Sequence, residues 1–491
     1  MISIMKESNH PKKRSSGRDF LKRGIILLIW ILIWQGVSMI ADNALLVASP
    51  MESLKALYGL LWEKDFWLSC LASMARIGAG FLAGSGFALF LAIVSSKVPL
   101  AEEFLRPFMN FCKTVPVAVF TVLILIWWGS SALTAIICFL VVMPNLYLNT
   151  LAGIKAVNVK MLEVAKVFGM PLGTKLFYIY RPALKPFVES AMELSLGMCW
   201  KSGVAAEVIG TPLHSIGGEL YLSKIYLDTP GIFAWSAVII LCSALFEKAV
   251  KGLTGLFWSS SPLCKACNMD SIRKNQTVIR KKTKERKTEL KERRNEQGFK
   301  ETLEKKETEE QDVNQVMFLQ VTGLSKSFGK QQVLKEFTCT YPSGKITYLT
   351  GASGSGKTTL FRCLCGLETY EEGKVTEGLT YSVQFQEDRL CEEESPVKNL
   401  EMVMGSSKAR KEGEKILLSL GLPWEALDKP CGELSGGMKR RVSLARAMEA
   451  NSDCVLLDEP YTGMDECTRR NAENYIKKRM ENRIVLMATH I

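Results

Sequence analysis

The hydrophobic positions divide this chain of 491 residues into regions of different character. Long apolar stretches fill residues 24–255, charged side chains dominate 256–315, and from residue 316 short apolar runs alternate with polar segments. Because a membrane-spanning helix needs roughly 20 mostly apolar residues, six stretches qualify as spans: about 24–41, 74–96, 115–129, 131–151, 187–210 and 231–250. The pattern therefore predicts an all-α six-helix transmembrane domain at 24–255, a charged linker at 256–315, and an α/β domain at 316–491.

The distribution of basic residues predicts the orientation of the spans. Residues 1–23 are basic, and the apolar run after them is too long for a signal-peptide core and lacks a small-residue cleavage site. Lys and Arg are also frequent after the second and fourth spans, whereas the loop at 42–70 and the loop at 211–230 carry few basic residues. By the positive-inside rule, the N-terminus and the C-terminal domain are expected in the cytoplasm, and the protein in the cytoplasmic membrane.

The net charge of +12 does not by itself indicate nucleic-acid binding. The basic residues flank apolar segments, and those of the linker are interspersed with Glu, which favours a tether near anionic lipid over a nucleic-acid contact. The 14 cysteines show no disulfide-like spacing, which indicates a reducing, cytosol-facing protein. Cys264 and Cys267 are spaced as CxxC without a second pair, so incidental thiols are favoured over a metal site.

Charges inside the predicted spans are a second source of candidate residues. Arg76, Glu193, Lys201 and Glu207 fall inside spans or at their ends. Because a charge in a membrane is costly, each is expected to face the bundle interior, a partner or water. Lys201 and Glu207 are candidates for lining a pathway, and the alternative is a helix-end charge that snorkels or forms a pair.

A glycine-rich loop from Gly351 to Thr358 follows an apolar run and precedes a predicted helix that begins near Lys357. The sequence GASGSGKT matches the complete P-loop pattern, in which backbone N–H groups converge on phosphates and the lysine reaches the β- and γ-phosphates. The threonine of the pattern ligates Mg²⁺. The predicted nucleotide-binding residues are Gly351, Ser353, Gly354, Gly356, Lys357, Thr358 and Thr359, and the predicted cofactors are ATP and Mg²⁺.

Two further motifs follow the P-loop in order. Asp458 and Glu459 end an apolar run, where an aspartate can hold the magnesium ion and the next glutamate can polarise the attacking water. Ser435, Gly436 and Gly437, in LSGGM, open a predicted helix whose N-terminus can bind phosphate. Apolar runs at 455–457 and 484–490 are predicted to form buried parallel strands.

Together the segments GASGSGKT, LSGGM, VLLDEP and LMATHI resemble the ATP-binding cassette of ABC transporters, over about residues 317–491. The resemblance implies that Gln386 senses magnesium, water and the membrane domain, and that His490 is a switch histidine beside the γ-phosphate. It also implies that Asp465 contacts the second cassette of a dimer and that Phe328 stacks on adenine. In the family each ATP lies between the P-loop of one cassette and the LSGGM motif of the other, so a homodimer is expected.

The membrane half is similar to bacterial importer permeases. Glu163, Ala165 and Gly169, followed by Pro182, keep the spacing of the EAA loop, a cytoplasmic helix–turn–helix at about 155–186 that grips the cassette. The segments SMARIGAGFLAG, LVASP and GMCWKSGVAAEVIG further resemble permeases of the nitrate, sulfonate and taurine uptake group. This resemblance implies ATP-driven uptake of a small solute that an extracytoplasmic solute-binding protein delivers.

The sequence departs from the cassette pattern in two places. Met438 stands where the family prefers glutamine, a position that is expected to tolerate change. The more serious departure is that the sequence ends one residue after His490, where the resemblance implies further strands and a helix. A truncated cassette is therefore expected. Alternatives to an importer half-transporter are an ABC exporter, a degenerate membrane-anchored ATP-binding protein, and a nucleic-acid-acting ATPase, which six spans disfavour.

Overall fold

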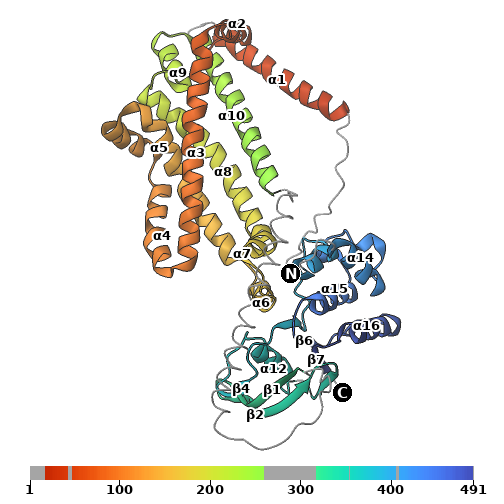
Figure 1. Ribbon diagram of the computed structural model, residues 1–491. Helices are drawn as coiled ribbons and strands as arrows, with labels where there is room; N and C mark the ends of the chain where they lie inside the picture. Colours follow the sequence, from red (N-terminus) through yellow and green to blue (C-terminus); the bar gives the residue numbers. More distant parts are fainter. Residues whose placement is uncertain (1–16, 42–46, 259–316, 353, 405–408, 490–491) are drawn as a thin grey trace, which may run out of the picture. The chain divides into compact units, whose positions relative to one another are not determined.

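The computed structural model describes residues 17–41, 47–258, 317–352, 354–404 and 409–489 (Figure 1). They form two compact units, one made of residues up to 155 together with 186–256, and the other of 156–185 together with the residues from 257 onward. Most of the predicted basic N-terminus and nearly all of the linker, with Cys264 and Cys267, lie outside the described residues. The predicted EAA loop thus belongs to the same unit as the predicted cassette.

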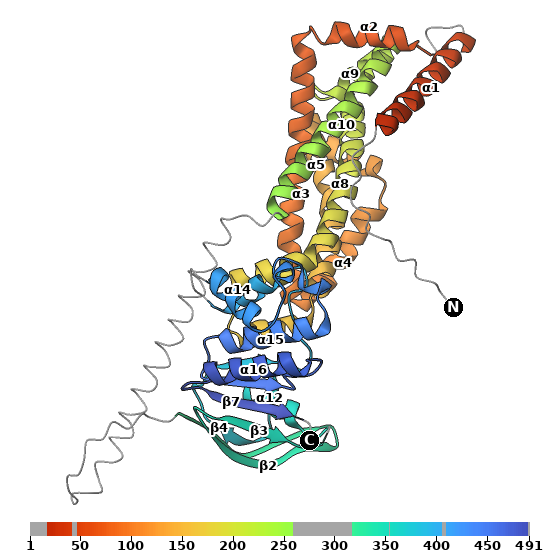
Figure 2. The same ribbon diagram turned by 90° about the vertical axis from the view of Figure 1, so that its right-hand side faces the viewer.

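The regular elements of the first unit are all helices within its described residues, as the apolar pattern predicts. Long helices run side by side along its length, with a short helix crossing at one end (Figures 1 and 2). Its helices are α1 (Gly17–Ala41), α2 (Pro50–Leu60), α3 (Lys64–Lys97), α4 (Pro99–Thr114), α5 (Val117–Lys155), the main part of α8 (Arg181–Gly210), α9 (Ile216–Ile225) and α10 (Thr229–Trp258).

Among the described residues, four helices are long and apolar enough to cross a membrane, namely α1, α3, α5 and α10. The predicted spans 115–129 and 131–151 both lie in α5, which breaks at Gly129, where φ is +73° and the backbone is not helical. The predicted span 187–210 lies in α8, whose 30 residues include Glu189, Glu193, Lys201 and Glu207. The six predicted segments are therefore all helical, although two share one interrupted element and one is rich in charge.

Small residues let α3 and α5 approach closely. A Cβ at Gly80 would lie 2.3 Å from the carbonyl oxygen of Ala135 and 2.6 Å from the Cβ of Cys138, so glycine is required at this crossing. Close contact of this kind drives helix association where lipid removes the hydrophobic effect between helices. Around it, large side chains such as Phe81, Tyr147 and Trp200 fill the buried core.

The second unit contains two sheets. An antiparallel sheet has the order β2 (Gln331–Pro342), β1 (Phe318–Phe328), β4 (Glu372–Val375). A parallel sheet has the order β3 (Ile346–Thr350), β7 (Ile484–Thr489), β6 (Cys454–Asp458), β5 (Tyr381–Gln384). The two buried parallel strands predicted near the end of the chain are confirmed as β6 and β7, which pair in parallel register.

The uniform hydrophobicity of β6 and β7 follows from burial on both faces of the sheet. In β6, Cys454 and Leu456 belong to one buried cluster, and Val455 and Leu457 belong to another. Because side chains alternate between the two faces of a strand, a strand covered on both sides needs apolar residues at every position. The sheet is therefore a rigid support for whatever follows the carboxyl ends of its strands.

The remaining elements of this unit are helices. Within the EAA loop they are α6 (Val159–Val167), α7 (Leu172–Lys175) and the π-helix η1 (Leu176–Tyr180), which continues directly into α8. The others are α12 (Lys357–Leu364), α13 (Pro396–Met404), α14 (Ala409–Ser419), the 3-10 turns η2 (Trp424–Ala426) and η3 (Cys431–Glu433), α15 (Gly436–Glu449) and α16 (Glu466–Arg479). The predicted helix start at Lys357 is confirmed.

Candidate functional site

The glycine-rich loop joins strand β3 to helix α12. Gly354 and Gly356 have φ of +81° and +90°, a backbone conformation that glycine adopts without steric cost. A Cβ at Gly356 would also lie 3.1 Å from the carbonyl oxygen of Val333. The ammonium group of Lys357 donates hydrogen bonds to the loop carbonyls of Gly351 and Ala352, so the cation lies over the loop that it terminates. Ser353 lies outside the described residues.

Thr358, the second residue of α12, meets the end of strand β6. Its hydroxyl donates a hydrogen bond of 2.8 Å to Oδ2 of Asp458. Burial raises the pKa of the Asp458 carboxyl, while the Thr358 hydrogen bond opposes that change. A hydroxyl and a carboxylate are the hard oxygen donors that Mg²⁺ prefers, so these two residues fit a magnesium ion.

Glu459 follows Asp458 in a left-handed backbone conformation, with φ of +51°. Its N–H donates to the carbonyl oxygen of Ala488 on β7, and its carboxylate accepts a hydrogen bond of 3.4 Å from the hydroxyl of Thr462. Positive φ at a residue other than glycine is a strained state that clusters at functional sites. Glu459 also lines the pocket beside the P-loop.

Most of the predicted nucleotide-binding and catalytic residues line one pocket of about 270 Å³. Its wall combines the P-loop, the end of β6, the glutamine after β5 and one aromatic ring: Phe328, Val333, Gly354, Ser355, Gly356, Lys357, Thr358, Thr359, Gln386, Asp458 and Glu459. The ring of Phe328 is 48% exposed, and the Lys326 ammonium lies 4.9 Å from its centre. An exposed ring at the rim of this pocket is available for stacking on a base.

The LSGGM motif and Asp465 do not line this pocket. Ser435 caps the N-terminus of α15 by accepting the N–H of Met438, and a Cβ at Gly437 would lie 2.7 Å from the carbonyl oxygen of Gly463. Asp465 caps α16 by accepting the N–H and hydroxyl of Thr468, and these hydrogen bonds hold the pKa of its carboxyl below the ordinary value. Within the described part of one chain these residues remain apart from the P-loop. Gly436 is the first residue of the same helix α15, and His490 lies outside the described residues.

Arg440 is a central residue of the site that the sequence reasoning missed. Its side chain is only 4% exposed, and it donates to the carbonyl oxygens of Phe385 (2.7 Å), Gln386 (2.9 Å) and Glu459 (2.7 Å). Arg440 thus ties the segment after β5 to the segment after β6. The sequence signal for this role is the pair Arg440 and Arg441 shortly after LSGGM. An arginine among buried residues of a helix needs several hydrogen-bond acceptors.

The EAA loop contacts the helix that carries the P-loop lysine. Both carboxylate oxygens of Glu163 accept hydrogen bonds from Arg362 on α12, at 2.7 and 3.1 Å, and one also accepts from Arg389, at 2.5 Å. The hydrogen bond with Arg362 is the main cause that lowers the pKa of Glu163, and Arg389 adds to it. Arg362 lies five residues after Lys357, and Arg389 three residues after Gln386.

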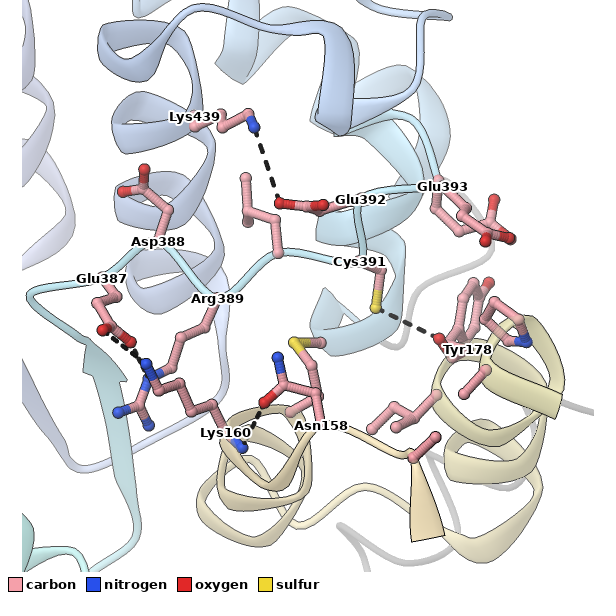
Figure 3. A pocket seen from close by; sticks show the side chains of 17 residues that line it. Asn158, Lys160, Tyr178, Glu387, Asp388, Arg389, Cys391, Glu392, Glu393 and Lys439 are labelled. Atoms are coloured by element: carbon pink, nitrogen blue, oxygen red, sulfur yellow. Dashed lines mark hydrogen bonds and ion pairs between the residues drawn. The ribbon is translucent and has the colours of Figure 1, made fainter. Parts of the chain in front are cut away.

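The other EAA positions shape this contact. Ala165 is fully buried in a cluster that includes Phe361 and Leu364 of α12. Gly169 has φ of +59° and forms the turn between α6 and α7. Pro182 lines a pocket of about 630 Å³ between the EAA loop and residues 387–394. Figure 3 shows Lys160 pointing to Glu387, an ion pair of 2.7 Å, and the Cys391 thiol facing the carbonyl oxygen of Tyr178.

Comparison with known proteins matches two families along this chain. Residues 334–462 match the ABC transporter family, and residues 84–257 match the binding-protein-dependent transport system inner membrane component. An aliphatic sulfonates import ATP-binding protein of Frankia alni is 37% identical over 172 residues, which are 35% of this chain and 70% of that protein. Its counterpart from Corynebacterium glutamicum is 36% identical over 177 residues, 35% of this chain and 72% of that protein. A solved putative ABC transporter ATP-binding protein from Pyrococcus furiosus is 25% identical, with a TM-score of 0.32, over 36% of this chain and 92% of that one.

The fold and the pocket define a P-loop ATPase joined to a helical membrane protein. The chain belongs to the ABC transporter family and carries a binding-protein-dependent permease and an ATP-hydrolysing cassette in one polypeptide. The predicted family, the two-part fold class and the identification as an ATP-driven transporter are confirmed. The match to a binding-protein-dependent permease favours an importer over the exporter considered from the sequence.

Proposed function

We propose that this chain is one half of a homodimeric importer that hydrolyses ATP to take up an aliphatic sulfonate or a related organic anion. The relatives are named as ATP-binding proteins for the import of aliphatic sulfonates, and these names support this substrate class. An extracytoplasmic solute-binding protein delivers the anion, and the N-terminus and the cassette face the cytoplasm, in agreement with the distribution of Lys and Arg. The predicted domain limits, with the permease at 24–255 and the cassette from 316, remain part of this proposal.

The observation that carries the proposal is the position of Glu163. One carboxylate of the EAA loop binds an arginine on the P-loop helix and an arginine on the Gln386 segment. Any displacement of the P-loop or of that segment therefore acts directly on the loop that continues into α8. An ATPase without transport would have no need for this contact.

In the proposed mechanism, the P-loop amides and Lys357 hold the β- and γ-phosphates, and the ring of Phe328 stacks on adenine. Thr358, Asp458 and Gln386 would hold Mg²⁺, which would supply positive charge against the phosphate oxygens. Glu459 orients and polarises the attacking water as general base, and His490 assists at the γ-phosphate.

The second half of each ATP site comes from the other copy of the chain. Ser435, Gly436 and Gly437 of one cassette approach the phosphates held by the P-loop of its partner, and Asp465 lies at the same junction. The separation of these residues from the P-loop pocket within one chain is what a shared site requires. ATP binding then closes the pair, and Glu163 transmits the closure to the permease as alternating access.

Uptake of radiolabelled ethanesulfonate tests the proposal. A host without its own sulfonate import should express the chain together with a solute-binding protein from the same genome. We expect uptake with the wild-type chain and a loss of at least about 100-fold with Glu459→Gln, because removal of a catalytic base costs 10²–10⁴-fold. ATP binding without uptake of any organic anion would instead identify a degenerate, non-transporting protein.

A further inference from the structure

Two sets of ionisable residues within the helical bundle have their partners on the protein itself. Glu207 of α8 is completely buried and binds Arg76 of α3 at 3.0 Å. The Ser73 hydroxyl donates to the same carboxylate at 2.7 Å, and the N–H of Gly217 donates at 3.2 Å. Arg76 also donates to two carbonyl oxygens of the segment before α9. This network fastens α3, α8 and α9 together around the buried carboxylate of Glu207.

A second set of charged residues in the bundle also forms ion pairs. Lys251 of α10 lies 2.7 Å from Glu193 of α8 and 2.7 Å from Glu247 one turn away. These three residues form an exposed network on the surface of the two helices. Their charges therefore have partners on the protein itself.

Lys201 of α8 is different. It is exposed, and it has no hydrogen bond or ion pair within the described residues. It lies nine residues from the end of α8 at Gly210, which corresponds to about 13 Å along the helix. The four-carbon stem of a lysine is shorter than this distance, so the ammonium group does not reach the helix end by snorkelling.

The surroundings of Lys201 on the helix surface are apolar. Exposed positions at helical spacing above and below it are Leu194, Met198, Ala205 and Ile209. If the predicted span 187–210 crosses the membrane, an unpaired cation on an apolar stripe at this position is costly against lipid, and such residues face a water-filled cavity or a partner. An unpaired ammonium is also what an anionic solute needs as a binding partner.

We propose that Lys201 faces the water-filled pathway of the permease and is the cation that attracts and selects the anionic cargo. This inference rests on the proposed function for the identity of the cargo, but the exposure of Lys201 to water can be tested without any cargo. The ammonium offers three N–H donors on a flexible stem, which suits the three equivalent oxygens of a sulfonate. A neutral solute would gain nothing from this charge.

The first test uses a thiol placed one turn from Lys201. Full-length protein with Met198→Cys, in lipid vesicles, is treated with an anionic and with a cationic water-soluble methanethiosulfonate reagent, and the reaction of the parent cysteines is subtracted. We expect the anionic reagent to be favoured, and we expect Lys201→Gln in the same background to lower the anionic-to-cationic rate ratio by about tenfold. No reaction with either reagent, or an unchanged ratio, overturns the proposal.

The second test measures ethanesulfonate uptake by Lys201 variants whose thermal unfolding and membrane insertion match the wild type. Lys201→Gln should raise KM by about tenfold with a smaller change in kcat, and Lys201→Arg should restore most of the affinity because the charge is kept. Equal KM values for wild type and Lys201→Gln overturn the proposal. If the wild-type chain takes up no sulfonate but the thiol test succeeds, the proposed cargo is wrong and the water-facing cation stands.

Discussion

Replacing Glu163 with glutamine removes the negative charge that Arg362 and Arg389 share. The side chains of Glu163, Arg362 and Arg389 are 19%, 27% and 11% exposed, so this contact is largely shielded from water. The variant keeps the size of the side chain and one carbonyl acceptor, but the other carboxylate oxygen becomes an NH2 group that cannot accept a hydrogen bond and that faces an arginine. We therefore expect the EAA loop to detach from the P-loop helix more readily, without a change in the nucleotide pocket.

The magnitude follows from the three hydrogen bonds. A bond to a charged group contributes about 1.5–3 kcal/mol, and partial exposure and the remaining amide reduce the net loss to about 2 kcal/mol. This loss corresponds to about a 30-fold shift toward the detached loop. Lys160→Gln is a matched control on the same helix, because the Lys160–Glu387 pair has an equally short distance of 2.7 Å but both side chains are more than half exposed. Its loss should be under about 1 kcal/mol.

Two measurements on the purified full-length chain separate these variants. Hydrogen exchange of the α6 amides should rise markedly in Glu163→Gln and change little in Lys160→Gln. In vesicles, sulfonate uptake per ATP hydrolysed should fall about tenfold or more in Glu163→Gln, because loop detachment uncouples hydrolysis from transport. Unchanged exchange together with unchanged uptake per ATP would refute the assignment of Glu163 as the coupling residue.

Three further outcomes follow from the site. Arg440→Gln should lower stability by about 3 kcal/mol, because buried carbonyl oxygens lose their charged donor; thermal unfolding that matches the wild type would contradict this role. Asp458→Asn should raise the unfolding temperature at pH 7 more than at pH 4, in magnesium-free buffer. The reason is that burial raises the pKa of Asp458, so the wild-type folded state loses stability as the pH rises above about 4. A rise in unfolding temperature that is the same at both pH values would contradict this reasoning. Ser435→Asp keeps an acceptor for the Met438 N–H but repels phosphate. When this variant is mixed with Lys357→Ala, half of the random dimers contain one intact site out of two, so about a quarter of the wild-type ATPase activity should return. No recovery of ATPase activity would contradict a shared site.

The chemistry of the nucleotide pocket was predictable because it resides in local motifs. Gly351–Thr358, Asp458 and Glu459 each occupy a fixed place relative to a strand end, and strand ends could be recognised from runs that are apolar at every position. The predicted helix start at Lys357 follows from the same pattern. The EAA spacing likewise predicted a helix–turn–helix, and the structure has helices α6 and α7 on either side of Gly169, whose φ is positive.

Other features depend on contacts that no local pattern encodes. The run that forms β1 was predicted to be β-like, but its antiparallel pairing with β2 and β4 was not foreseen, because these strands pair across several register shifts. Arg440 was overlooked because its acceptors are backbone carbonyl oxygens, which the sequence does not mark. The sequence also does not distinguish the environments of Lys201 and Glu207, which are six positions apart on α8. The packing of the helices places Glu207 against Arg76 and leaves Lys201 without a partner within the described residues.

The central claim is that hydrolysis at the P-loop pocket drives uptake of an organic anion through the permease of the same chain. The most direct measurement is simultaneous recording of ATP hydrolysis and ethanesulfonate accumulation in vesicles that contain the full-length protein, with its solute-binding protein on the opposite side from ATP. We predict accumulation in proportion to ATP hydrolysed, with both abolished in Glu459→Gln. Hydrolysis that continues in Glu459→Gln, or accumulation that is independent of ATP, would contradict the account.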